Sequence, residues 1–124
     1  MTMTLIFIGG GMGSLLRYYI GLLLAEPGAR FPWGTLLVNL LGCFILGGLM
    51  ASQWGKFALS DSVRIGLGTG LLGGFTTFST FGRDGVLLLQ SGEVERAVLY
   101  LLTSVVGGLF CAYLGIKCVE SMGV

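Results

Sequence analysis

Residues 73–85 read GGFTTFSTFGRDG, and this stretch decides how the chain is arranged. Its middle part, residues 76–81, contains two phenylalanines and four hydroxyl side chains: Thr76, Thr77, Ser79 and Thr80. No residue of this middle part carries a formal charge, and the surrounding chain consists mostly of Leu, Val, Ile, Phe and Gly. A polar group in apolar surroundings costs free energy unless it is hydrogen-bonded. The cluster therefore requires either internal partners or a polar ligand.

The composition is that of a membrane protein. Of the 124 residues, 54% are hydrophobic and 10% are charged, whereas an average soluble domain has about 25% charged residues. The length suits a single domain covering residues 1–124. Because Lys and Arg form no cluster, we expect no nucleic-acid partner.

The chain offers little for catalysis or for a transition metal. It has no histidine, and its three cysteines, which lie in apolar runs and form no CxxC pair, are Cys43, Cys111 and Cys118. A zinc or haem site is therefore not expected. Residues 68–73 match GxGxxG, but no strand precedes them, so we reject a dinucleotide site. With no nucleophile–base pair either, we expect no enzyme.

Four stretches are long enough to cross a bilayer, which takes about 20 apolar helical residues. We place the spans at about 4–24, 33–53, 62–90 and 96–117. Short loops that hold many of the charges join them. The sequence thus predicts an all-α membrane protein with four transmembrane helices.

The third span is too long for one helix. Its 29 residues at a rise of about 1.5 Å each would reach roughly 43 Å, well beyond the hydrocarbon thickness. Its centre is rich in glycine, so we predict a break near residues 73–76. Non-helical backbone at membrane depth occurs only where protein buries it or where it lines a wet cavity. The break should therefore face the inside of an assembly.

Small residues recur four apart, a spacing that lets helices approach closely in lipid. The pairs are Gly9/Gly13, Gly66/Gly70, Gly70/Gly74 and Ser104/Gly108. Four short helices alone make a thin bundle, so we expect a homo-oligomer. The pattern by itself indicates packing and not function.

The charges do not fix an orientation in the membrane. Cytoplasmic loops normally carry the excess of Lys and Arg, but here the two sides balance, with Lys56, Arg64 and Lys117 against Arg30, Arg83 and Arg96. A protein that inserts both ways has this balance, which would permit an antiparallel homodimer. The alternative is a single orientation set by other features.

Several polar residues fall inside the spans. Arg17 either snorkels to an interface or lines an anion-attracting vestibule. Asn39 is either an interhelical hydrogen-bonding residue or a donor to a ligand, and Tyr100 and Ser104 share one face of the fourth span. No Asp or Glu lies within the first, second or fourth span, and Asp84 lies toward the end of the third. A proton-coupled cation exporter generally needs such a carboxylate.

The cluster at residues 76–81 is chemically suited to passing a small anion. Hydroxyl and amide groups donate hydrogen bonds without a permanent charge, and aromatic ring edges are positive. Each hydrogen bond to a charged group returns about 1.5–3 kcal/mol, against a desolvation cost on the order of 20 kcal/mol in the Born limit. A series of weak donors is therefore required, and a fixed cation in a narrow path would bind too tightly. Ordinary helix packing remains the alternative explanation.

Three motifs together resemble the small bacterial fluoride channels, the Fluc or CrcB family. These are GGFTTFSTF at 73–81, GGxxGSxxRY at 9–18, where the family usually has Ala in place of Ser14, and GTLLVNLLGCFILG at 34–47. The resemblance covers essentially the whole chain in length, layout and motif order. It implies a passive fluoride-selective channel in the bacterial cytoplasmic membrane that exports fluoride, built as an antiparallel dual-topology homodimer with two pores.

The resemblance also implies roles for single residues. Phe78 and Phe81 become the pore phenylalanines and Asn39 a pore donor, and Arg17 lies near the aqueous vestibule. The remaining polar pore residues are Ser79, Thr80, Tyr100 and Ser104. The backbone carbonyls of Gly73 and Thr76 would hold a structural sodium ion on the dimer axis.

Two departures from the family pattern concern the edge of the proposed pore. Gly108 stands one turn beyond Ser104, where family members can carry serine, and Asp84 stands where glutamate is common.

A small four-helix proton-coupled multidrug exporter is the main alternative, but it should carry a glutamate in the first span, where this chain has Arg17. A non-transporting assembly protein would explain the glycines and not the polar cluster.

Overall fold

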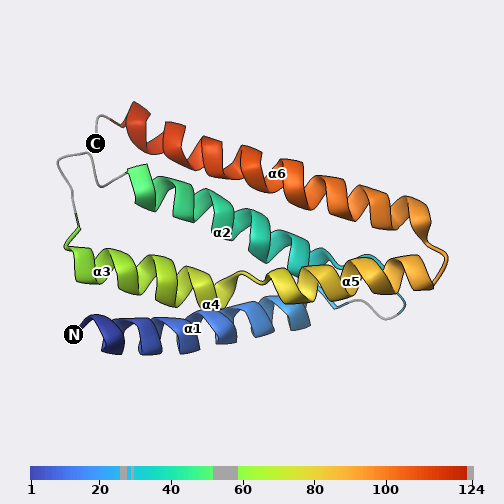
Figure 1. Cartoon of the computed structure of the whole chain (residues 1–124), viewed down its shortest axis with the longest axis horizontal. Coiled ribbons are helices and arrows are strands. Elements are labelled where there is room, and N and C mark those ends of the chain that lie inside the picture. The colour runs from blue at the N-terminus through green and yellow to red at the C-terminus, as the bar shows by residue number, and fades with distance from the viewer. Residues whose placement is uncertain (26–27, 29, 52–58, 123–124) are drawn as a thin grey trace.

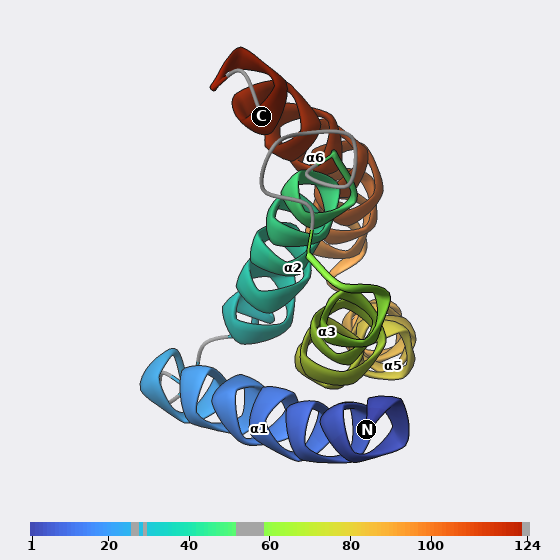
Figure 2. The same cartoon turned by 90° about the vertical axis from the view of Figure 1, so that its left-hand side faces the viewer.

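The computed structural model describes residues 1–25, 28, 30–51 and 59–122, and the regular elements among them are all helical. The three long helices are α1 (Thr2–Leu23), α2 (Trp33–Ala51) and α6 (Val94–Ser121). A row of shorter helices connects α2 to α6: α3 (Asp61–Ile65), the π-helix η2 (Gly66–Leu72), α4 (Gly73–Phe75) and α5 (Phe78–Gln90). Figure 1 shows this row lying between α1 and α2, with α6 along the far side of α2. Figure 2, from the end, shows α1 and α6 on opposite sides of the molecule.

Three of the described helices, α1, α2 and α6, are long and apolar enough to cross a membrane. The expected span at 62–90 is divided among the shorter helices, none of which has that length alone. Helix α6 is longer than the expected 96–117, since it begins at Val94 and ends at Ser121. Helix α2 is described to Ala51, so the last two positions of the expected span 33–53, and Lys56 of the charge count, lie outside the described residues.

The chain leaves helical geometry at Thr76 and Thr77, between α4 and α5 (Figure 1). Thr76 has φ −82° and ψ 159°, and Thr77 has φ −152° and ψ 117°. Helix α5 begins directly afterwards because Thr77 is its N-cap: the Thr77 hydroxyl oxygen accepts a hydrogen bond from the Thr80 N–H at 3.2 Å. The break expected near residues 73–76 therefore consists of two extended threonines.

Before α4 the chain forms a π-helix over Gly66–Leu72, which was not predicted from the sequence. Such helices are rare and shift the register of the side chains that follow. Three of its residues are glycines, at positions 66, 68 and 70. Gly66 and Gly70 lie directly against α1, so the two elements approach closely there.

Glycines let three pairs of elements touch through their backbones: α1 with η2, α1 with α4, and α2 with α6. A Cβ atom on Gly13 of α1 would lie 2.0 Å from the Leu71 carbonyl oxygen, and one on Gly74 would lie 2.4 Å from the Gly10 carbonyl oxygen. Helices α2 and α6 meet in the same way at Gly47 and Gly115.

The small-residue spacing found in the sequence thus marks the contact of α1 with η2 and α4. At Gly108 the situation differs, because a Cβ there would lie at an ordinary 3.5 Å from the Cys43 sulfur.

The apolar core is small and most large apolar side chains are exposed. Leu36, Leu88, Ala97 and Tyr100 form the buried cluster between α2, α5 and α6. By contrast, the exposed large apolar residues include Phe7, Leu23, Phe78, Val106 and Leu109. Exposed apolar surface on this scale marks a membrane or protein contact.

We expect Gly13→Ala to destabilise the protein, because its Cβ would meet backbone that cannot move without separating α1 from α4. Overpacking of this kind costs about 1–3 kcal/mol. Gly11→Ala, on the same helix, is the matched control: nothing lies within 4 Å of its added Cβ. Thermal unfolding of the purified protein in detergent should show a lower midpoint for Gly13→Ala and no loss for Gly11→Ala. Equal midpoints would contradict the close approach described here.

Candidate functional site

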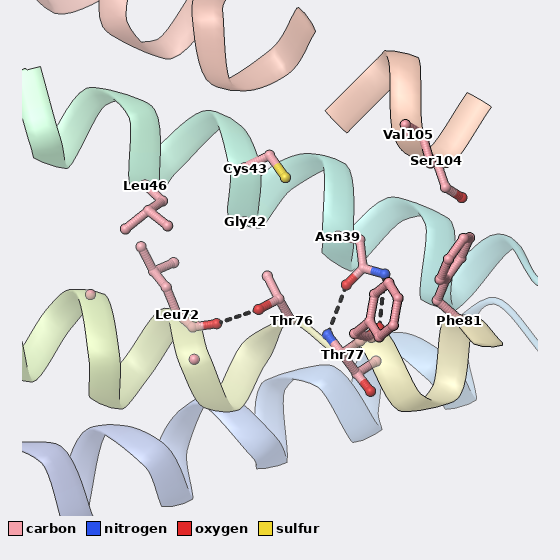
Figure 3. A pocket seen from close by; sticks show the side chains of 13 residues that line it. Asn39, Gly42, Cys43, Leu46, Leu72, Thr76, Thr77, Phe81, Ser104 and Val105 are labelled. Atoms are coloured by element: carbon pink, nitrogen blue, oxygen red, sulfur yellow. Dashed lines mark hydrogen bonds between the residues drawn. The ribbon is translucent and has the colours of Figure 1, made fainter. Parts of the chain in front are cut away.

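A cavity of about 330 Å³ opens beside the helix break (Figure 3). Helices α2, η2, α4, α5 and α6 and the break contribute to its wall. Its lining residues are Asn39, Gly42, Cys43, Leu46, Gly68, Leu72, Gly73, Thr76, Thr77, Phe78, Phe81, Ser104 and Val105. None of these residues carries a formal charge. The structure thus brings most of the pore residues implied by the family resemblance to one place, with carbonyl, hydroxyl and amide groups among apolar ones.

Asn39 holds the break in position from helix α2. Its side-chain amide donates to the Thr77 carbonyl oxygen at 3.1 Å, and its side-chain oxygen accepts from the Thr77 N–H at 2.8 Å (Figure 3). One side chain therefore satisfies both backbone groups of an extended residue, as a neighbouring helical turn otherwise would. Interhelical hydrogen bonding is one of the two roles that the sequence predicted for Asn39. The second amide hydrogen of Asn39 is left for another acceptor.

The two phenylalanines lie together on α5 but differ in burial. Their ring centroids are 5.5 Å apart, and the Phe81 ring packs against the ring of Tyr100 at 5.4 Å. The Phe78 side chain, by contrast, is 83% exposed. One wall of the cavity is therefore a ring that this chain leaves largely uncovered.

Two hydroxyl groups on α6 are buried without a hydrogen-bond partner in the described part of the chain. They belong to Tyr100 and to Ser104, one helical turn further on. Leaving such a group unsatisfied costs about 1–3 kcal/mol. Ser104 lines the cavity, and Tyr100 lies behind Phe81 with 0% of its surface exposed. The Ser104 hydroxyl is therefore available to a polar ligand in the cavity, whereas the Tyr100 hydroxyl does not line the cavity and lies beside the Thr35 side chain.

A second cavity, of about 430 Å³, lies on the other side of the break. Its polar lining residues are Ser14, Arg17, Tyr18, Thr35, Thr77, Thr80 and Arg83. Thr77 lines both cavities, so the break forms the wall that they share. The two cations therefore lie beside the uncharged cavity and not in it. We call this second, cationic cavity the vestibule.

Besides Arg17 and Tyr100, two more of the sequence-predicted site residues do not line the uncharged cavity. Thr80 lines the vestibule. Ser79 is exposed, lines neither cavity, and has its hydroxyl 3.4 Å from that of Thr77.

The break also releases the backbone carbonyls of Gly73 and Thr76. In a continuous helix the Thr77 N–H would bond the Gly73 carbonyl, but here it donates to Asn39. The Thr76 carbonyl oxygen accepts a hydrogen bond from the Arg17 guanidinium at 2.9 Å. A carbonyl oxygen has two lone pairs, so Thr76 retains capacity for a second partner. Oxygen donors of this kind suit a hard cation.

Sequence reasoning missed Thr35 and gave no role to Asp84. The Asp84 side chain is buried, and one of its carboxylate oxygens accepts from the Thr35 hydroxyl at 2.8 Å. Helical spacing carries a signal for both residues, since Thr35 lies four before Asn39 and Asp84 lies three after Phe81. Residues at these spacings share a helix face with the predicted site residues Asn39 and Phe81.

Known proteins are similar to this chain over most of its length. A family model described as CrcB-like protein, Camphor Resistance (CrcB), matches residues 4–116. A Thermus thermophilus protein named fluoride-specific ion channel FluC is 50% identical over 91% of this chain and 90% of its own length. Proteins of the same name from Chloroflexus aurantiacus and Rhizobium meliloti are 47% and 40% identical, over 90% and 95% of this chain and 89% and 95% of their own lengths. The family resemblance found in the sequence is confirmed: the chain belongs to the CrcB family.

Proposed function

We propose that this protein is a passive, fluoride-selective ion channel that lets fluoride leave the cell. The relatives named above are fluoride-specific ion channels. The observation that carries the proposal is the chemistry of the cavity at the break. Its lining is uncharged, yet the Ser104 hydroxyl and the nearby Tyr100 hydroxyl are buried with no partner in the described chain.

The proposed mechanism replaces the water around fluoride by weak donors in series. The Ser104 hydroxyl and the free amide hydrogen of Asn39 offer hydrogen bonds, and the Phe78 and Phe81 rings offer their positive edges. Arg17 in the vestibule raises the local anion concentration without entering the narrow path. Because no fixed cation lines the cavity, an ion binds weakly enough to leave again.

We propose that two copies in antiparallel orientation complete the channel, with two pores built from both subunits. The exposed Phe78 ring supports this, because a second chain would cover the open wall of the cavity. The exposed apolar faces and the balance of positive charges between the two sides agree with it. A Phe78 ring that faced lipid could not contact an anion in the pore.

We propose, as the family resemblance implies, that a sodium ion is held on the dimer axis. The carbonyls of Gly73 and Thr76 would hold it, and two copies would supply four such oxygens. The Arg17 guanidinium on Thr76 competes for that carbonyl, so the second lone pair is the one available to sodium. When bound, the ion would neutralise carbonyl dipoles that face one another across the axis.

The proposed location is the bacterial cytoplasmic membrane, crossed four times. Helices α1, α2 and α6 have the length and composition for three crossings, and the row from α3 to α5 would make the fourth. Within the dimer this row would be buried. Protein would then cover its broken backbone, as irregular backbone at membrane depth requires.

A proton-coupled multidrug exporter finds no support. The relatives compared above are named as channels for fluoride. The buried carboxylate that such an exporter needs is represented by Asp84, but Arg83 and Thr35 already hold both of its oxygens.

We expect Phe78→Ile to slow fluoride efflux from liposomes by roughly tenfold, corresponding to about 1.4 kcal/mol of barrier, because the positive ring edge is lost. Phe7→Ile is the matched control, since the Phe7 side chain is also 83% exposed but lies on α1 and lines neither cavity. The readout is a fluoride electrode.

Both variants should keep the elution volume of the parent protein. If Phe78→Ile and Phe7→Ile both conduct as the parent does, the ring-edge role and its place in the proposed function are wrong.

We expect sodium to stabilise the purified protein. A ligand that binds only the folded state adds RT ln(1 + [L]/Kd) to stability, so the unfolding midpoint should rise with sodium concentration. N-methylglucamine at equal ionic strength is the control, because it is too large for the carbonyl site. The same rise in both salts would contradict a specific sodium site.

A further inference from the structure

Asp84 presents a difficulty for an anion channel. The residue has 8% of its surface exposed, and it is the buried charged residue of the described part of the chain. It lies on α5, one turn after Phe81, beside the buried Tyr100 hydroxyl, whose surroundings include Thr35. A negative charge so close to the proposed path repels fluoride, and low-dielectric surroundings strengthen that repulsion.

Two side chains hold the carboxylate of Asp84, and only one of them is charged. The Thr35 hydroxyl donates to Oδ2 at 2.8 Å. Arg83 donates to Oδ1 twice, from Nη2 at 2.7 Å and from Nε at 3.1 Å. Both carboxylate oxygens are thus engaged, and the charge of Asp84 is balanced by its neighbour in the sequence.

The pair lies between the vestibule and a third, smaller cavity. Arg83 and Thr35 line the vestibule, whereas Asp84 lines a cavity of about 190 Å³ with Arg30 and Ser91. On α5, Asp84 follows one turn after Phe81, which lines the uncharged cavity. The guanidinium therefore lies on the vestibule side of the carboxylate.

Resting on the proposed function, we propose that Arg83 is a positioning residue that masks Asp84 from fluoride. The asymmetry of the pair supports this: the Arg83 side chain is 68% exposed and the Asp84 side chain 9%. Removal of one partner from a buried ion pair leaves an uncompensated charge. The arginine then matters less for attracting fluoride than for cancelling a charge that would expel it.

The test is fluoride efflux from liposomes for four proteins: the parent, Arg83→Gln, Asp84→Asn and the double variant. Arg83→Gln should slow efflux by roughly tenfold, equivalent to about 1.4 kcal/mol of barrier. Asp84→Asn should stay within about twofold of the parent, and the double variant should return to that level, because no charge then needs masking. Arg83→Lys, which keeps the charge, should conduct nearly as the parent does.

Ionic strength gives a second readout that loss of structure would not reproduce. Raising it with an impermeant salt should leave the Arg83→Gln defect in place, since salt screens a buried charge poorly. Arg96→Gln is the control for the loss of an exposed, ion-paired arginine, and it should conduct normally.

Three results would overturn the inference: a double variant as slow as Arg83→Gln, an Arg83→Gln variant as fast as the parent, or a defect that disappears at high salt. The first or the third result would indicate that Arg83 acts by attracting anions. A parent protein that conducts no fluoride would instead overturn the proposed function, and this inference with it.

Discussion

The structure depends on how an apolar chain satisfies the backbone groups released at one helix break. Thr76 and Thr77 are extended. The Thr76 N–H still bonds the Leu72 carbonyl at 2.9 Å, but the Thr76 carbonyl and the Thr77 N–H leave the helical ladder. Asn39 takes both groups of Thr77, Arg17 takes the Thr76 carbonyl, and the Thr77 hydroxyl caps α5. In surroundings without water each orphan would be costly. The partners that prevent this cost come from α1 and α2, so the break ties these helices together.

That requirement also shapes the two cavities. Glycine contacts bring α1 against the row of short helices closely enough for Arg17 to reach the break. Asn39 reaches it from the opposite side. A single extended segment consequently separates the cationic vestibule from the uncharged cavity, and Thr77 in this segment lines both cavities. The vestibule could attract an anion, and the weak donors of the uncharged cavity could then bind it. Weak binding of this kind suits conduction better than tight binding.

Much of this arrangement is predictable from the sequence because it is local. The excess length of the third apolar stretch and its glycines predict the break, and spacing alone places Phe78 with Phe81 and Tyr100 with Ser104. The π-helix was not predictable, since the same glycines fit an α-helix. Contacts between distant side chains, such as Thr35 with Asp84, were missed for a different reason: they depend on how two helices are rotated about their axes.

The central claim is that uncharged donors at the helix break pass fluoride and exclude a larger, less strongly hydrogen-bonding halide. The most direct test is efflux from liposomes that contain the purified parent protein, followed in parallel with fluoride and chloride electrodes. We expect rapid loss of internal fluoride while chloride remains inside. Equal release of both ions would contradict selection by the cavity, and retention of both by well-folded protein would contradict a channel altogether.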